Sequence, residues 1–425
     1  MRRLLTLNLS MLGAIIILLA VWFFILDKGN EDLPLGQDGG GKPSQSAQQG
    51  GEPGDDVSKD DGNPSAGNGD EEAPEGNQTG NPAEGSEGAT DDGGSTGSTG
   101  KGTTDGGYDD SEKVRLSFVG DILLGASVGE LLQKNGYDFP YAESKLYLSE
   151  PDVMAGNLEY PVTHRGVPAE DKTFVFKGTP EALPALKNAG FDVLSLANNH
   201  TLDQGVEGLL DTMGHLDEAG IAHMGAGNND KEAYKPVIRE VRGVKIAYIG
   251  LSRVVPKVSW KADKNNPGVA ETYDVTRAIA AIKDAKERAD IVAVMVHWGV
   301  EKADKPEKYQ RDDARAYIDA GADLVIGSHP HVLQGFETYK GKWIAYSLGN
   351  FIFSVYPKGR SGDTGVLDAV CTPKGDCELQ FHPMYADMAQ PKPMAADKGA
   401  ELLKQLTQLS FGVKLGSDGK LSPVK

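Results

Sequence analysis

Five apolar runs in this 425-residue chain end in clusters of histidine, asparagine or acidic residues, and this pattern limits the possible folds most strongly. Short apolar runs of this kind predict buried strands. Ligands of α/β sheets gather at the carboxyl ends of strands. If the strands share a sheet, the five clusters are therefore expected to converge on one rim. The runs and the residues that follow them are 114–120 with Asp121, 153–156 with Asn157, 193–197 with Asn198, 291–296 with His297, and 324–327 with Ser328.

Helical patterns lie between many of these runs, and this alternation predicts an α/β fold. The later part of the chain is richer in strand-like runs, which predicts a second sheet packed on the first. Within it, residues 236–251 are typical of a hairpin that turns at Arg242 and Gly243. The helical patterns span residues 127–134, 181–189, 207–219, 275–288, 308–320 and 400–409.

The chain begins with an apolar run over residues 4–26. About 20 apolar residues span a bilayer as a helix, and Arg2 and Arg3 before the run favour a cytoplasmic N-terminus. A cleaved signal peptide is the alternative, but the end of the run lacks the small residues typical of a cleavage site. We expect residues 1–26 to form a cytoplasmic stub and a single-pass signal anchor in the cell membrane, with the rest of the chain extracellular.

Residues 27–112 are rich in glycine, serine, proline and acidic residues. Residues 27–113 contain 21 acidic and 5 basic residues, a net charge of −16. So few large apolar side chains cannot offset the entropy cost of ordering, so a disordered linker is predicted before a folded domain over 113–425. Residues 114–425 carry 41 acidic and 36 basic residues, a net charge of −5. The acidic excess thus belongs to the linker, and we expect no nucleic-acid partner.

The two cysteines, Cys371 and Cys377, flank a turn-like Thr-Pro-Lys-Gly-Asp stretch. They can pair across a hairpin, and an oxidising exterior would allow the disulfide. Two free buried thiols remain the alternative.

Several of the polar residues also have ordinary structural explanations. Asp121 and Asp203 could each cap a helix that follows. Asn199 could be a turn residue, and His297 could be a buried core histidine. Taken together, these explanations require several independent coincidences at successive strand ends.

The segment His329-Pro330-His331 is harder to explain without a ligand, because proline fixes the backbone between two imidazoles. Only eight histidines occur in the chain, and four lie in the polar clusters. Imidazole and carboxylate ligands suit Mn, Fe and Zn. The sequence therefore predicts one or two divalent transition-metal ions.

Seven blocks occur in one order along residues 114–390. They are Gly120-Asp121, Asn157-Leu158-Glu159, Ala197-Asn198-Asn199-His200-x-x-Asp203-x-Gly205, Gly225-Ala226-Gly227, His297-Trp298-Gly299-x-Glu301, Gly327-Ser328-His329-Pro330-His331 and Tyr346-Ser347-Leu348-Gly349-Asn350-Phe351. This set resembles the CapA family of bacterial capsule and poly-γ-glutamate biosynthesis proteins, within the calcineurin-like metallophosphoesterase superfamily. The resemblance implies a four-layer α/β/β/α sandwich with two metals between loops of its two sheets.

The resemblance also implies roles for individual residues. His200 would protonate a leaving group, and Asp203 would orient it. Asn350 from the last block is expected to contact the substrate. Arg253 and Lys302 are expected to contact it too, because they are cations in loops that follow strand ends at the same rim. The implied metal ligands are Asp121, Glu159, Asn199, His297, His329 and His331.

Two positions depart from the superfamily pattern. The first motif normally has a histidine two residues after the aspartate, where this chain has Leu123. The bridging position holds Glu159 rather than aspartate. Both differences are expected to weaken the first metal site.

The predicted function is assistance in the synthesis, export or processing of an anionic capsule polymer, poly-γ-glutamate, through a metal-dependent phosphoesterase-like hydrolase site. The expected partners are this polymer or a phosphoester, the membrane itself through the N-terminal helix, and membrane synthase subunits. The alternative is a non-catalytic polymer-binding scaffold subunit of a synthase complex.

Overall fold

The computed structural model describes residues 112–424, and within them the chain forms two large mixed sheets. The eight-stranded sheet has the order β16-β15-β14-β1-β2-β3-β4, with β13 also paired to β1. The six-stranded sheet has the order β11-β12-β10-β9-β7-β6. In the first sheet, β1, β2, β3 and β4 pair with their neighbours in parallel. In the second sheet, β7, β9, β10 and β12 do the same. The predicted α/β class and the second sheet are thus confirmed.

The strands of the larger sheet are β1 (Val114–Ile122), β2 (Val153–Leu158), β3 (Phe191–Ser195), β4 (Ala222–Met224), β13 (Asn350–Ile352), β14 (Asp363–Cys371), β15 (Cys377–Asp387) and β16 (Gln390–Pro393). Those of the smaller sheet are β6 (Val237–Val241), β7 (Val244–Ser252), β9 (Ile291–His297), β10 (Leu324–Ser328), β11 (Phe336–Tyr339) and β12 (Lys342–Ala345). Two short pairs complete the set: β5 (Ala226–Gly227) with β8 (Gly268–Val269), and β17 (Val413–Leu415) with β18 (Leu421–Pro423).

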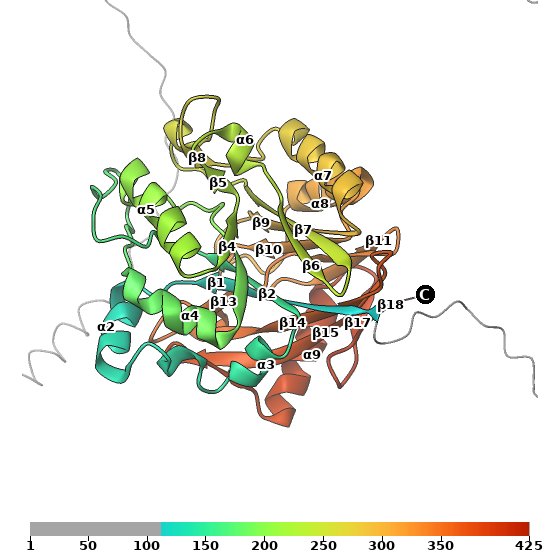
Figure 1. Ribbon diagram of the computed structural model, residues 1–425. Coiled ribbons are helices and arrows are strands. Elements are labelled where there is room, and N and C mark those ends of the chain that lie inside the picture. The colour runs from blue at the N-terminus through green and yellow to red at the C-terminus, as the bar shows by residue number, and fades with distance from the viewer. Residues whose placement is uncertain (1–111, 425) are drawn as a thin grey trace, which may run out of the picture. The chain divides into compact units, whose positions relative to one another are not determined.

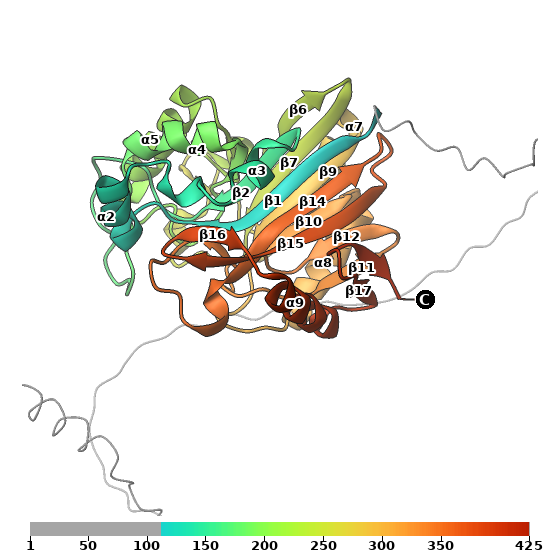
Figure 2. The same ribbon diagram turned by 90° about the horizontal axis from the view of Figure 1, so that it is seen from below.

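Helices cover the outer faces of both sheets (Figures 1 and 2). One group packs on the larger sheet: α2 (Ala126–Asn135), α3 (Lys145–Ser149), α4 (Leu183–Ala189) and α5 (Gly205–Glu218). Another packs on the smaller sheet: α6 (Asp230–Ala233), α7 (Thr276–Arg288) and α8 (Lys308–Ala320). The last helix, α9 (Ala396–Leu409), packs beside β15 and β11. The order of layers is helix, sheet, sheet, helix.

The core between the sheets is built from alternate residues of facing strands. Leu116 and Phe118 of β1 are fully buried there, and the Phe118 ring lies 6.4 Å from that of Tyr248 in β7. Burial of large aromatic and aliphatic side chains is the main favourable term in such packing. The two sheets are therefore held face to face, and their strand ends are fixed relative to one another.

An irregularity in β1 turns Asp121 toward the other sheet. The pairing of β1 with β2 shifts between Phe118 and Asp121. Because side chains alternate along a strand, such a shift reverses which residues point inward. Ile122 therefore packs in the outer core under the helices, whereas Asp121 faces the smaller sheet. Gly120 permits this path, because a Cβ there would lie 1.8 Å from the Gly349 carbonyl oxygen.

The predicted hairpin is confirmed, with β6 and β7 joined at Arg242 and Gly243. Arg242 has φ of 51° and Gly243 of 84°, the left-handed values that tight hairpin turns need. Cys371 and Cys377 face each other across β14 and β15 and form a disulfide. The pairing left open by the sequence is therefore settled in favour of the bridge.

The predicted anchor over residues 4–26 and the predicted linker lie outside the described residues, apart from Glu112. Among residues 112–424, no helix has both the length and the apolar character needed to cross a membrane.

The buried carboxylate of Asp368 links β1, β14 and β15 of the larger sheet. Asp368 of β14 accepts a hydrogen bond from the Ser117 hydroxyl at 2.6 Å and from the Arg115 Nε at 3.1 Å. The Nε2 atom of His382 in β15 lies 3.0 Å from the same carboxylate. Burial alone would raise the pKa of Asp368, but these partners lower it below its usual value.

We predict that Asp368→Asn lowers the free energy of unfolding by about 1–3 kcal/mol, because it removes charge-assisted hydrogen bonds to buried groups. A depressed pKa gives stability that is present above the unfolded-state value of about 4 and lost as the pH falls through the folded-state value. The difference between the variant and the wild type should therefore shrink in acid. Denaturant unfolding across the pH range measures it, with Asp387→Asn on the exposed end of β15 as the control.

Candidate metal centre

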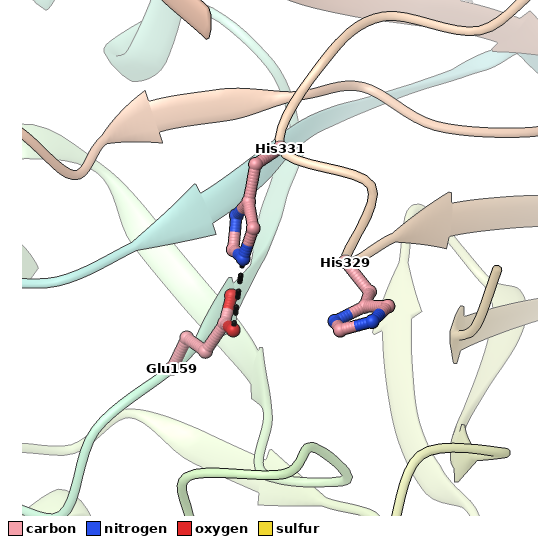
Figure 3. A group of neighbouring side chains, drawn as sticks. All are labelled: Glu159, His329 and His331. Carbon is pink, nitrogen blue, oxygen red and sulfur yellow. Dashed lines mark ion pairs between the residues drawn. The ribbon is translucent and has the colours of Figure 1, made fainter. Parts of the chain in front are cut away.

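The carboxyl ends of strands from both sheets meet at one buried cluster of carboxylates and imidazoles. Asp121 and Glu159 come from the ends of β1 and β2, and His297 ends β9. His329 and His331 follow β10. The sequence pattern suggested a single shared sheet, but the cluster lies where two facing sheets meet. Figure 3 shows Glu159, His329 and His331 directed toward one another from these separate elements.

Glu159 lies at the centre of this cluster. Its side chain is fully buried, and its Oε1 atom has no hydrogen-bond partner. The Nε2 atoms of His297 and His331 each lie 3.7 Å from Oε1. Burial, and then the charge of Asp121, raises the pKa of Glu159 well above its usual value. This carboxylate belongs to both groups of potential ligand atoms that lie within 4.8 Å of one another: Glu159 with His329 and His331, and Asp121 with Glu159 and His297.

The histidines differ in their surroundings. His329 is buried with no partner for its Nδ1 atom, and burial lowers its pKa to about 3. Burial also lowers the pKa of His297 well below its usual value. For His331, the Asp121 carboxylate 3.3 Å from Nδ1 outweighs the effect of burial and raises the pKa. His329 and His331 both have positive φ, 95° and 57°, a strained backbone that is characteristic of functional sites.

Asn157 connects the members of the cluster, although no role was predicted for its side chain. Its Nδ2 atom donates to Asp121 Oδ1 at 2.8 Å and lies 3.3 Å from His297 Nδ1. Its Oδ1 atom accepts a hydrogen bond from Asn198 at 3.1 Å. The sequence contained a signal for this role, because Asn157 follows an apolar run and lies two residues before Glu159 in the same family block. Asn157 thus fixes the orientation of groups from both sheets.

Asn199 joins the cluster through His297. Its Oδ1 atom lies 2.8 Å from His297 Nε2. The explanation of Asn199 as a mere turn residue therefore does not account for its side chain, which is buried against a histidine of the opposite sheet.

These residues fit a divalent transition metal on chemical grounds. Two buried carboxylates and three imidazoles lie together, yet Glu159 Oε1 and His329 Nδ1 lack hydrogen-bond partners. Leaving buried polar atoms unpaired is costly, and both atom types are ligands for Mn, Fe and Zn. Asp121, Glu159, Asn199, His297, His329 and His331 would hold one or two such ions.

The predicted pair of His200 and Asp203 is present beside the cluster. His200 Nδ1 lies 2.7 Å from Asp203 Oδ2, and both side chains are buried. Asp203 does not cap the following helix α5, whose N-cap is Gln204. Burial lowers the pKa of His200, although Asp203 acts in the opposite direction.

Lys172 contacts both members of this pair, although it belongs to none of the seven family blocks. Its Nζ atom pairs with Asp203 and donates to the Asn199 carbonyl at 2.7 Å. It also lies 3.1 Å from His200 Nδ1. Only a tenth of the Lys172 side chain is exposed. No spacing pattern joins position 172 to positions 200 and 203, so sequence periodicity carries no signal for this contact.

The loop that carries Lys172 covers one side of His200. The Phe176 amide donates to Asp203 Oδ2 at 2.7 Å, and the Phe176 ring lies 4.3 Å from that of His200. Phe353 contacts both Phe176 and His331 through its ring. These two phenylalanines give the site an apolar edge between the proposed proton donor and the metal cluster.

The three expected substrate contacts have different surroundings. Asn350 Oδ1 lies 2.9 Å from His331 Nδ1, so this amide helps to orient a proposed ligand. Arg253 pairs with Asp313 at 3.1 Å and stacks 4.3 Å from the Tyr309 ring centre. Lys302 is exposed, and its amide donates to the Pro330 carbonyl at 2.7 Å. Of the three, the Lys302 side chain is the one left open to solvent beside the histidine turn.

Leu123, which stands where the superfamily pattern has a histidine, is 2% exposed and packs in the apolar core under the outer helices. Its surroundings are thus suited to an aliphatic side chain. His331, which lies beside Asp121, is already one of the implied ligands and does not replace the missing histidine.

A family model described as bacterial capsule synthesis protein PGA_cap matches residues 115–355, more than half of the chain. The chain belongs to this family. The match includes every proposed metal ligand and ends before β14. The expected resemblance to CapA proteins is confirmed.

Two CapA proteins illustrate the likeness. The capsule biosynthesis protein CapA of Bacillus anthracis is 37% identical over 309 residues, which cover 70% of this chain and 74% of that protein. The PGA biosynthesis protein CapA of Bacillus subtilis strain 168 is 38% identical over 314 residues, covering 72% and 81%. Among solved structures, the NAD nucleotidase of Haemophilus influenzae aligns with a TM-score of 0.39 and 13% identity over 70% of this chain and 57% of that one. That structural likeness is too weak to support a functional assignment.

We predict that the full chain binds at least one divalent transition metal and that His297→Ala with His329→Ala sharply lowers metal content. The double change removes two neutral imidazoles from a cluster whose carboxylates cannot satisfy a transition metal alone. Elemental analysis after loading with Mn, Fe or Zn and desalting measures the result. His164→Ala with His215→Ala, which removes one exposed and one partly exposed imidazole outside the cluster, is the matched control. Equal metal content in both double variants would contradict the assignment.

Proposed function

We propose that this PGA_cap family member assists the synthesis, export or processing of an anionic capsule polymer, poly-γ-glutamate, through a metal-dependent hydrolase-type site. The observation that carries the proposal is the buried cluster centred on Glu159 Oε1, which has no hydrogen-bond partner and lies among three histidines. The names of the relatives support the polymer class, since both are described as capsule or PGA biosynthesis proteins.

The chemistry proposed for the site is hydrolysis, most simply of a phosphoester. When bound, a divalent ion supplies Lewis-acid polarisation of the ester and activation of water. The residues of the chain supply orientation and the proton. His200 Nδ1 faces Asp203 Oδ2, so Nε2 is the ring nitrogen left to face a leaving oxygen, and it would donate its proton from the imidazolium form that Asp203 stabilises. Lys172 and the Phe176 amide hold Asp203 in place, and thereby fix the plane of the His200 ring.

We predict that His200→Asn retains the metal and loses turnover by about 10²–10⁴-fold, the usual contribution of general acid catalysis. His200 is assigned to proton transfer and not to metal binding, so the ligand set survives its removal. Turnover of a chromogenic phosphodiester and metal content are measured on the same preparation. His215→Asn, on the exposed face of α5, is the control. Parallel loss of metal and turnover would mean that His200 has been given the wrong role.

A non-catalytic scaffold is the second candidate, and Leu123 favours it. This buried leucine stands in place of a histidine that the superfamily pattern uses at the first metal. A site that lacks one ligand can keep the fold and bind polymer without hydrolysis. Full metal loading with no turnover of phosphodiester or polymer would favour the scaffold over the hydrolase.

We also propose that residues 4–26 anchor the protein in the cell membrane, with the capsule synthesis domain outside the cell and next to membrane synthase subunits. The support is the apolar run preceded by Arg2 and Arg3.

A reporter enzyme that works only outside the cytoplasm, fused after residue 110, is predicted to be active and to stay in the membrane fraction. The same fusion without residues 1–26 is the control and should remain inactive in the cytoplasm. Mature protein that starts near residue 27 and is released into the medium would refute the anchor and favour a cleaved signal peptide.

A further inference from the structure

A groove of about 570 Å³ lies between α6 and α7, on the outer face of the smaller sheet. Its floor is apolar and includes Pro236, Ala280, Ala281 and the ring of Tyr234. The Tyr234 hydroxyl already donates to the Glu271 carbonyl. The floor therefore offers aliphatic and aromatic surface with little unmet hydrogen-bonding capacity.

The walls of the groove carry an excess of positive charge. Two acidic residues among them are already paired, Asp230 with Arg277 at 3.5 Å and Asp284 with Arg288 at 2.8 Å. The remaining cations are exposed, and no ion pair engages them within residues 112–424. These unpaired cations are Lys231, Lys235 and Lys264. With the two ion pairs neutral, they leave a local excess of three positive charges, on a domain whose own net charge is negative.

A contact between two loops links the groove to the candidate metal centre. Lys172, which contacts His200, lies 5.3 Å from the centre of the Trp260 ring. Trp260 belongs to the segment that follows β7, and this segment continues to Lys264 on the wall of the groove.

We infer that the groove between α6 and α7 is a binding site for an acidic polymer that has an aliphatic backbone and a carboxylate on each unit. Methylene groups of such a polymer would cover the alanines of the floor, while its carboxylates would meet Lys231, Lys235 and Lys264. This inference rests on the proposed function and names poly-γ-glutamate as the ligand. It places the polymer at a site separate from the metal cluster.

Binding of poly-γ-glutamate to the full chain tests the charged walls. The triple variant Lys231→Glu, Lys235→Glu and Lys264→Glu should weaken binding by at least about tenfold, because like charges then face the polymer. Lys134→Glu, Lys145→Glu and Lys404→Glu change the net charge equally on exposed helical positions elsewhere, and should have a much smaller effect. Binding by the wild type should also fall steeply between about 0.1 M and about 1 M salt, since the Debye length shortens from about 10 Å to about 3 Å.

The apolar floor has its own test. Ala280→Glu places a carboxylate in the groove at an exposed position of α7, and it should weaken binding more than Gln133→Glu on α2. Polyphosphate carries the charge of a polyanion but no aliphatic backbone. It should therefore compete poorly with poly-γ-glutamate at equal charge. Equal competition would overturn the part of the inference that rests on the floor.

The proposals for the metal site and for the groove can be tested independently. The groove variants should keep metal content and phosphodiester turnover, and His297→Ala with His329→Ala should keep polymer binding. If the groove triple variant binds as well as the wild type, the inference is wrong. Binding lost instead in Lys302→Glu, Lys305→Glu and Lys308→Glu would place the polymer at the rim of the metal centre, and would also overturn it.

Discussion

Burial of like charges is the constraint around which the candidate centre is arranged. Asp121 and Glu159 are both fully buried, and burial together with their mutual repulsion opposes ionisation of the second carboxylate. Asn157 donates to both, but Glu159 Oε1 still lacks a donor. A buried charge is stable only when it is paired or coordinated. The imidazoles of His297 and His329, whose pKa values burial lowers, are suited to act as ligands of a cation rather than to supply the positive charge themselves.

The fold creates this situation by bringing strand ends from two sheets to one place. Neither sheet alone has a complete ligand set, because the carboxylates come from the larger sheet and the histidines from the smaller. The shift in β1 then turns Asp121 inward, and Gly120 allows the Gly349 segment to approach. A change in the packing between the sheets would therefore shift the proposed ligands of the candidate metal centre, even though the core residues involved do not contact them. The strained histidine backbone beyond β10 is tolerated because the same packing surrounds it.

Charge is distributed unevenly over the domain, and this distribution would affect where a polyanion binds. Many of its cations have an acidic partner, as Arg253 does with Asp313 and Arg165 with Asp211. Such pairs are expected to attract an external carboxylate weakly. Among residues 112–424, the lysines without an ion pair include Lys231, Lys235 and Lys264 on the walls of the groove and Lys302 beside the histidine turn. A domain with a negative net charge can thus bind an acidic polymer locally, because screening limits the reach of its other charges.

Local pattern determined the elements and most of the ligands. The helix expected over 308–320 is α8 with the same bounds, and the turn at Arg242 and Gly243 joins β6 to β7. Both follow from backbone geometry and from the burial of one face of the element, and these depend on residues that are close together in the sequence. The polar clusters after the apolar runs predicted that these residues converge, and the family resemblance implied which of them are metal ligands. The hairpin across Cys371 and Cys377 implied a strand after Cys377, but the length of β15 was not predicted, because its residues alternate between buried and exposed only in part.

What the tertiary structure alone decided is which distant residues share an environment. Lys172 meets His200 and Asp203 because a loop folds back over the strand ends, and Asp368 meets Arg115 through the pairing of strands more than 200 positions apart. Likewise, the division of the ligands between two facing sheets depends on how the sheets pack. Local periodicity does not predict such contacts, since they depend on strand order, register and the path of loops. The sequence by itself therefore determined the kinds of ligand, and the packing of the two sheets determined their geometry.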